Sequence, residues 1–119
     1  MAEFDFEKLH VYQKAVSFAD EIYRLTRAFP KQEQFGMTSQ LRRAALSIPL
    51  NIAEGVGRDS FTERKRFYFF ARGSIYECVP LLALAERQAF LPAATQNKLL
   101  ANCHELARML NGLISALKK

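Results

Sequence analysis

The C-terminal part of the chain repeats apolar residues at the spacing of a helix that lies along other helices. The intervals are four, three, four, three and four residues, at Leu99, Cys103, Leu106, Leu110, Leu113 and Leu117. Such a heptad-like repeat places all its members on one side of an α-helix, and neighbouring helices must cover that side. Pro92 suits the first turn of this helix, and Lys118 and Lys119 complement the dipole at its end. The stripe predicts an all-α fold.

A similar apolar pattern lies between Leu9 and Phe29. Its positions alternate spacings of three and four residues, which keeps them on one side of a helix: Tyr12, Ala15, Ala19, Ile22, Thr26 and Phe29. Pro30 is expected to end this helix, because the residue before a proline is pushed out of the helical region. The polar segment from Lys31 to Gly36 is predicted to be a loop.

The second helix is predicted to begin at Thr38 or Ser39, since a hydroxyl there can accept a hydrogen bond from an orphaned amide. Its apolar positions are Leu41, Ala45, Ile48 and Ile52. Pro49 removes one backbone donor inside this pattern, and a kink is expected because the pattern continues beyond it. The helix should end near Gly55 to Gly57, where glycine suits a left-handed terminus.

The third helix is predicted to begin with Ser60-Phe-Thr-Glu63, which has the form of a capping box. Its expected apolar face is Phe67, Phe70, Ala71, Ser74, Cys78, Leu81 and Ala85. Gly73 and Pro80 weaken an isolated helix, so tertiary packing must support a helix that runs unbroken to Phe90.

These four segments together predict one domain over residues 1–119, folded as an antiparallel up-down-up-down four-helix bundle. The expected interior includes Ile22, Ile48, Ile52, Leu106 and Leu110. Half of the 119 residues are hydrophobic, enough for a core without metal or disulfide help.

The chain shows no sign of export or membrane insertion. Its first residues, Met1 to Glu7, are acidic and broken in pattern, and no apolar run approaches the roughly 18 residues of a membrane span. Cys78 and Cys103 are too few for a disulfide framework and lie among apolar residues, where a thiol acts as a small hydrophobe. A cytoplasmic protein without a membrane segment is expected.

The usual signatures of catalysis and metal binding are missing from the sequence. His10 and His104 lie far apart, and neither stands in a cluster of metal-ligand spacing. Gly55-Val-Gly57 lacks the third glycine and the strand of a dinucleotide site. No histidine that could act as a base occurs on the predicted helices that carry Ser39, Ser47 or Ser74. We therefore expect no enzyme activity, no metal and no cofactor.

Polar residues of the second helix form a stripe about 100° from its apolar centre, with Arg43 just beyond: Gln40, Ser47, Asn51, Glu54 and Arg58. In one interpretation these groups are structural, with Glu54 and Glu77 pairing with Arg42 or Arg43. In the other they line a surface on which arginines bind phosphates.

Seven of the seventeen basic residues lie between Arg42 and Arg72, interleaved with Phe61 and the run Phe67 to Phe70. With a net charge of +5, this region admits an anionic partner. The aromatic rings could stack on single-stranded bases, but such a run more often packs into a core or a subunit interface. Because the run covers almost every side of the helix, one monomer cannot hide it, and a partner surface is expected. The candidate nucleic-acid-binding residues are Arg43, Arg58, Arg64, Lys65 and Arg66.

Four segments resemble bacterial four-helix-bundle proteins of the 23S rRNA-intervening-sequence family: residues 6–15, 35–45, 47–55 and 73–77. The motif's polar residues fall here on Arg42, Arg43, Asn51, Glu54, Arg58, Ser74 and Glu77. The resemblance implies a homo-oligomeric ring of five subunits, a pentamer. It also implies kinship with the accessory variability protein of diversity-generating retroelements, a basic, nucleic-acid-associated partner of a reverse transcriptase.

The sequence therefore leads to two hypotheses about function. The first is a homo-oligomeric accessory protein that binds RNA or DNA, and the second is a protein-interaction scaffold whose basic surface is incidental. Phosphate binding weakens steeply with salt, because each neutralised phosphate releases counterions. A scaffold shows no such dependence.

Overall fold

The computed structural model describes residues 4–117, in which every regular element is a helix. Its elements in order are η1 (Asp5–Lys8), α1 (His10–Thr26), η2 (Lys31–Glu33), α2 (Met37–Val56), α3 (Phe61–Arg87) and α4 (Ala93–Ala116), where η denotes a short 3₁₀ helix. No strand occurs in residues 4–117. The prediction of an all-α fold with four long helices is confirmed.

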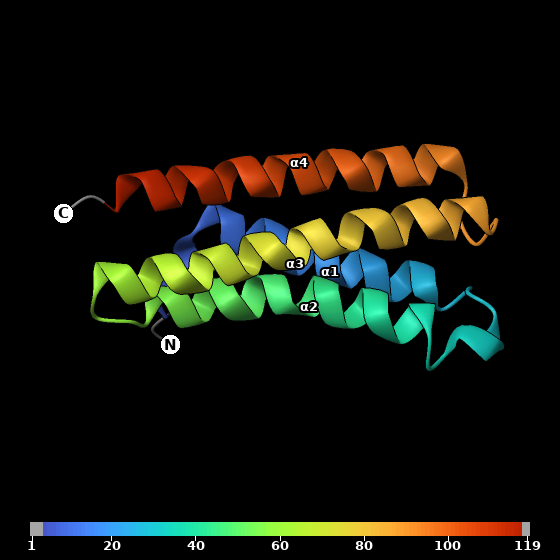
Figure 1. Ribbon diagram of the computed structural model, residues 1–119, viewed down its shortest axis with the longest axis horizontal. Coiled ribbons are helices and arrows are strands. Elements are labelled where there is room, and N and C mark those ends of the chain that lie inside the picture. The colour runs from blue at the N-terminus through green and yellow to red at the C-terminus, as the bar shows by residue number, and fades with distance from the viewer. Residues whose placement is uncertain (1–3, 118–119) are drawn as a thin grey trace.

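The four long helices run side by side along the longest dimension of a molecule that measures 46 × 30 × 22 Å (Figure 1). The α1–α2 and α3–α4 connections lie at one end, and the α2–α3 turn lies at the other. Each helix packs against two others, α3 against α2 and α4, and α1 against α2 and α4. The outer face of α3 is thereby flanked by α2 on one side and by α4 on the other.

The core forms along the predicted apolar stripes. All five residues expected in the interior are fully buried, as is the first part of the α4 stripe: Ile22, Ile48, Ile52, Leu99, Leu106 and Leu110. Leu113 and Leu117 at the end of the α4 stripe are only half-buried. The predicted dipole partners Lys118 and Lys119 lie outside the described residues.

The connection from α1 to α2 differs from the prediction. Helix α1 ends at Thr26, although Phe29 is still buried beside the core. Helix α2 begins at Met37, and the Oε1 atom of Glu33 accepts a hydrogen bond from its amide at 3.1 Å. Capping by Thr38 or Ser39 was therefore wrong, because the glutamate of the preceding 3₁₀ turn reaches the helix start first.

Helix ends also depart from the expected glycine geometry. Helix α2 continues past Pro49 and ends near Gly57, as predicted, but Gly57 has a φ of −78°, so the left-handed terminus was wrong. The left-handed residue is Ala89, with a φ of 62°, just beyond α3. Its amide donates to the Glu86 carbonyl, and that of Phe90 to the Ala85 carbonyl, both at 2.9 Å, as in a Schellman ending.

Helix α3 passes unbroken through Gly73 and Pro80 and ends at Arg87, three residues before Phe90. Its buried face is Tyr68, Ala71, Ser74, Ile75, Cys78, Leu82 and Ala85. Phe67 and Phe70 were wrongly placed on this face, because four consecutive aromatic residues carry no periodicity that could select among them. Leu81 is half-buried and packs against the core. Pro92 lies just before the first residue of α4, Ala93, and not inside the first turn as predicted.

One close approach fixes α3 against α2. A Cβ atom added to Gly55 would lie 2.7 Å from a ring carbon of Tyr68, closer than real Cβ contacts come. Glycine at this position therefore lets the buried Tyr68 ring pack directly on the α2 backbone. This contact lies beside the α2–α3 turn and holds the start of α3, which carries most of the candidate cations.

Candidate nucleic-acid interface

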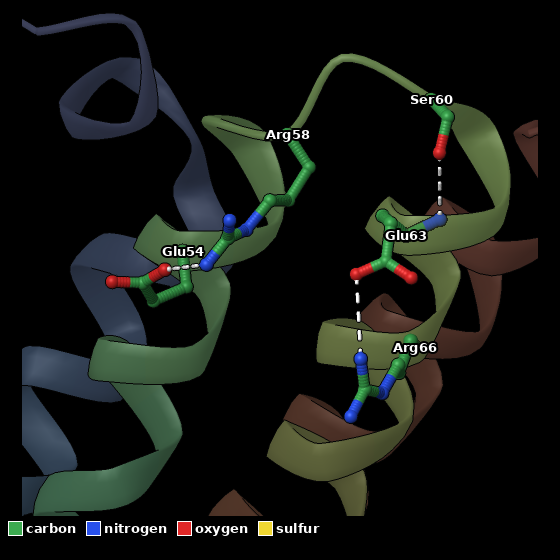
Figure 2. A network of polar contacts seen from close by, with 5 residues as sticks. All are labelled: Glu54, Arg58, Ser60, Glu63 and Arg66. Carbon is green, nitrogen blue, oxygen red and sulfur yellow. Dashed lines mark hydrogen bonds and ion pairs between the residues drawn. The ribbon is translucent and has the colours of Figure 1, made fainter.

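The α2–α3 turn is held by local polar contacts (Figure 2). The Ser60 hydroxyl accepts a hydrogen bond from the Glu63 amide at 3.1 Å, which confirms the Ser60 half of the predicted capping box. The Glu63 carboxylate pairs with Arg66 at 3.4 Å. The Arg66 side chain thus points back toward Glu63 in the first turn of α3.

Arg58 lies two residues beyond the end of α2, on the other side of this turn. Its guanidinium pairs with Glu54, one helical turn earlier, at 2.6 Å, and lies 4.6 Å from the centre of the Phe67 ring. The predicted pairing of Glu54 with Arg42 or Arg43 was therefore wrong. The i,i+4 neighbour is nearer than an arginine three turns away.

Arg64 closes the turn from the side of α3. Its Nε atom donates to the Arg58 carbonyl at 2.7 Å, so its guanidinium is anchored, and it forms no ion pair with another described residue. Lys65 follows directly and is likewise without an ion pair to the described chain. The structure brings Arg58, Arg64, Lys65 and Arg66 together around one turn.

Arg43 does not belong to this group. It lies on α2 thirteen residues before the last residue of that helix, Val56, which is about 20 Å along the helix axis at ~1.5 Å per residue, and Arg58 lies beyond Val56. It lines a pocket of about 250 Å³ between α2 and α3, together with Gln40, Ala44, Ser47, Glu77, Pro80 and Leu81. Arg43 and Glu77 face this pocket without forming an ion pair in the described structure.

The uncharged polar residues of the motif bond to the backbone of their own helices. The Ser47 hydroxyl donates to the Arg43 carbonyl and the Asn51 side-chain amide to the Ser47 carbonyl, both at 2.9 Å. The Ser74 hydroxyl donates to the Phe70 carbonyl at 3.2 Å. These contacts favour a structural interpretation for the uncharged part of the stripe.

Arg42 ties α2 to the end of α1. Its Nε atom donates to the Thr26 hydroxyl at 2.7 Å, a second nitrogen donates to the Tyr23 carbonyl at 3.2 Å, and the guanidinium lies 4.7 Å from the Tyr23 ring centre. Carbonyls at a helix end lack partners within the helix, and arginine supplies donors for them. Arg42 is therefore engaged in the fold.

The aromatic run of α3 divides between core and surface. Tyr68 is buried, while Phe69 and Phe70 keep 43% and 46% of their surface exposed. The chain by itself thus leaves two of the four rings partly exposed, as the sequence indicated. Their predicted burial against a neighbouring subunit stays a prediction.

The titratable groups of the core are held in their neutral forms. Burial raises the pKa of Cys78 to about 12 and that of Cys103 to about 11. Burial also raises the pKa of Tyr68, with the positive charge of Arg64 acting in the opposite direction. Because the thiolate is the nucleophilic form, both cysteines behave here as small hydrophobes.

Among residues 4–117, no three side chains of His, Cys, Asp or Glu gather as a metal-binding group. Within the same range, no helix combines the length and apolar character that crossing a membrane requires.

A family model described as the 23S rRNA-intervening sequence protein matches residues 7–112. A crystal structure of a protein of unknown function from the S23 ribosomal protein family of Bacteroides thetaiotaomicron has the same fold. Its TM-score is 0.78 at 23% sequence identity, and the alignment covers 87% of this chain and 97% of that one. No protein with a curated description matches the sequence.

Proposed function

We propose that this chain, which belongs to the 23S rRNA-intervening sequence protein family, is a non-enzymatic, homo-oligomeric protein that binds RNA or DNA. The observation that carries the proposal is the group of cations around the α2–α3 turn, Arg58, Arg64, Lys65 and Arg66, beside partly exposed aromatic rings. Guanidinium groups donate in a fork that matches phosphate oxygens, and such contacts position a nucleic acid without reading its sequence.

The subunit of this proposal is a single domain, an antiparallel up-down-up-down four-helix bundle. The alternation of the connections between the two ends of the molecule supports that topology (Figure 1). The engaged side chains of Arg42, Asn51, Glu54 and Ser74 support a structural role for the motif, and the neutral buried thiols support the absence of a nucleophile.

Assembly into a ring would increase the total positive charge of the proposed binding surface. A ring repeats the same patch around its axis, so that five copies of a chain with a net charge of +5 would carry about +25. The exposed Phe70 ring supports such assembly, because it offers apolar surface to a neighbour. Kinship with the accessory variability protein adds a reverse transcriptase as a protein partner of the proposal, in the cytoplasm.

A protein-interaction scaffold is the second candidate, and exposed apolar side chains favour it. Phe69, Phe70 and Tyr76 keep 43%, 46% and 58% of their surface exposed on one helix. Patches of this kind mark protein interfaces as well as base-stacking surfaces. The two candidates differ in their response to salt.

The test is a binding titration against structured RNA, single-stranded DNA and duplex DNA over a range of salt concentrations. The proposal predicts an affinity that falls linearly with salt on logarithmic axes. The triple variant Arg64→Glu/Lys65→Glu/Arg66→Glu should abolish binding, because it reverses three cations at the α2–α3 turn. Its melting temperature and sedimentation must match those of the parent.

The matched control is Arg24→Glu/Arg27→Glu/Lys31→Glu, which lowers the net charge by the same amount at the opposite end of the molecule. The control should keep most of the parent's affinity. If the parent and the first triple variant bind equally well, or if the parent sediments as a monomer, the proposal is wrong. The protein-interaction scaffold then becomes the better interpretation.

A further inference from the structure

One side of α3 carries a continuous stripe that contains no acidic residue. Its positions follow one another at intervals of three or four: Phe61, Lys65, Phe69, Arg72, Tyr76, Val79, Ala83 and Arg87. At 100° per residue these positions share one side of the helix. The three acidic residues of α3, Glu63, Glu77 and Glu86, all fall elsewhere on the helix. We call this set the acid-free stripe.

The N-terminal part of the acid-free stripe alternates aromatic and cationic side chains. Phe61, Phe69 and Tyr76 keep 47%, 43% and 58% of their surface exposed. Lys65 and Arg72 stand between them. The rings follow one another at about 12 Å and then about 10 Å along the axis, from ~1.5 Å per residue.

Direct contacts show that neighbouring members of the stripe meet on the surface. The Arg72 guanidinium lies 4.8 Å from the centre of the Phe69 ring and 5.8 Å from that of Tyr76. Its Nη1 atom donates to the side-chain oxygen of Asn111 on α4 at 2.8 Å. An uncharged partner thus holds the arginine between two rings and leaves its positive charge without a carboxylate.

The stripe's charge separates it from the other cations near the turn. Lys65 and Arg72 form no ion pair with another described residue, whereas Arg58 and Arg66 are paired with Glu54 and Glu63. Arg64 also lacks an ion pair to the described chain, but its Nε atom is bound to the Arg58 carbonyl on the opposite side of the turn. Open aromatic faces alone would also suit a second protein chain. Together with two cations lacking a carboxylate and a stripe without acids, they fit a polyanion that carries stackable bases.

We infer that the acid-free stripe binds single-stranded nucleic acid, with bases stacked on the exposed surfaces of Phe69 and Tyr76, and phosphates near Lys65 and Arg72. This inference rests on the proposed function and names its substrate class. Bases inside a duplex are stacked on one another and present no free face to these rings. A single strand offers its bases for stacking, whatever the sequence.

The test compares a mixed-sequence single-stranded oligonucleotide with the duplex of the same sequence, by fluorescence anisotropy at several salt concentrations, on the full chain. The parent should bind the single strand at least about tenfold more tightly. The variant Phe69→Ala/Tyr76→Ala should weaken that affinity by about tenfold or more, because it removes two rings on which bases stack. Its salt dependence should stay unchanged, since no cation is removed.

Two variants serve as controls. Phe69→Tyr/Tyr76→Phe keeps both rings and should bind as the parent does, and Phe35→Ala removes an aromatic ring that is 88% exposed outside α3 and should have no effect. Equal affinity for duplex and single strand, or full binding by the alanine variant, overturns this inference but leaves the proposed function standing. If the parent binds no nucleic acid, both the inference and the proposed function are wrong. If Phe69→Ala/Tyr76→Ala loses binding and also forms a smaller assembly than the parent, the stripe belongs to a subunit interface. That result also overturns the inference.

Discussion

The two flanks of α3 use the same residue types in opposite ways. On the side of α2, Arg58 and Arg66 lie over Phe67, and each is paired with a carboxylate, at 2.6 Å and 3.4 Å. On the side of α4, Arg72 lies beside Phe69 and Tyr76 and is held by the uncharged Asn111. On the first flank both of these arginines are balanced by a carboxylate, whereas on the second Arg72 keeps its positive charge.

This difference shows that counting basic residues in a sequence does not locate a phosphate-binding surface. An exposed arginine that already pairs with a carboxylate must give up that contact to bind a phosphate. An arginine held by an amide oxygen keeps its charge available in a fixed position. Phosphate binding by the acid-free stripe therefore depends on the residues that contact its cations, such as Asn111, as well as on the cations themselves.

The largest expected effect concerns the core that supports both flanks. Leu110→Ala removes a fully buried side chain of α4, next to the Asn111 that holds Arg72. The free energy of unfolding should fall by about 2–5 kcal/mol, because buried atoms are removed and a cavity remains. Chemical denaturation followed by circular dichroism measures it. A decrease well below this range would show that α4 is loosely packed and cannot hold Arg72 in a fixed position.

A smaller effect is expected on the α2 flank alone. In Gly55→Ala the new methyl group would meet the Tyr68 ring at 2.7 Å, and either the ring or α3 must shift. We expect the free energy of unfolding to fall by about 1–3 kcal/mol, as for other overpacked sites. Because the acid-free stripe lies on the other flank, single-strand binding should change little under conditions where the variant is folded. If the variant is as stable as the parent, Tyr68 does not fix the spacing between α2 and α3.

The sequence predicted the four helices and their main apolar stripes, because each stripe repeats at helical spacing over several turns. It could not choose among Phe67, Tyr68, Phe69 and Phe70, since consecutive aromatic residues fit every side of a helix. Only the structure shows that Tyr68 is the buried ring and that Gly55 makes room for it.

The candidate site was predicted in composition but not in arrangement. The sequence grouped Arg43 with Arg58, which the structure separates along α2, and it did not single out Arg72 for binding. The spacing of the acid-free stripe is present in the sequence, but its meaning depends on exposure and on Asn111, which lies 39 residues away in the chain. Long-range partners of this kind leave no local signal.

The most direct measurement compares the salt dependence of single-strand binding in two double variants with the same net charge. Lys65→Gln/Arg72→Gln removes two cations without carboxylate partners, and Arg58→Gln/Arg66→Gln removes two that are already paired. The first variant should reduce the slope of log affinity against log salt by about 1.4, or ~0.7 for each phosphate of a single strand that is no longer neutralised. The second should reduce it by less than half as much. Equal reductions, or a larger one for Arg58→Gln/Arg66→Gln, would contradict the claim that nucleic acid binds to the unpaired cations of α3.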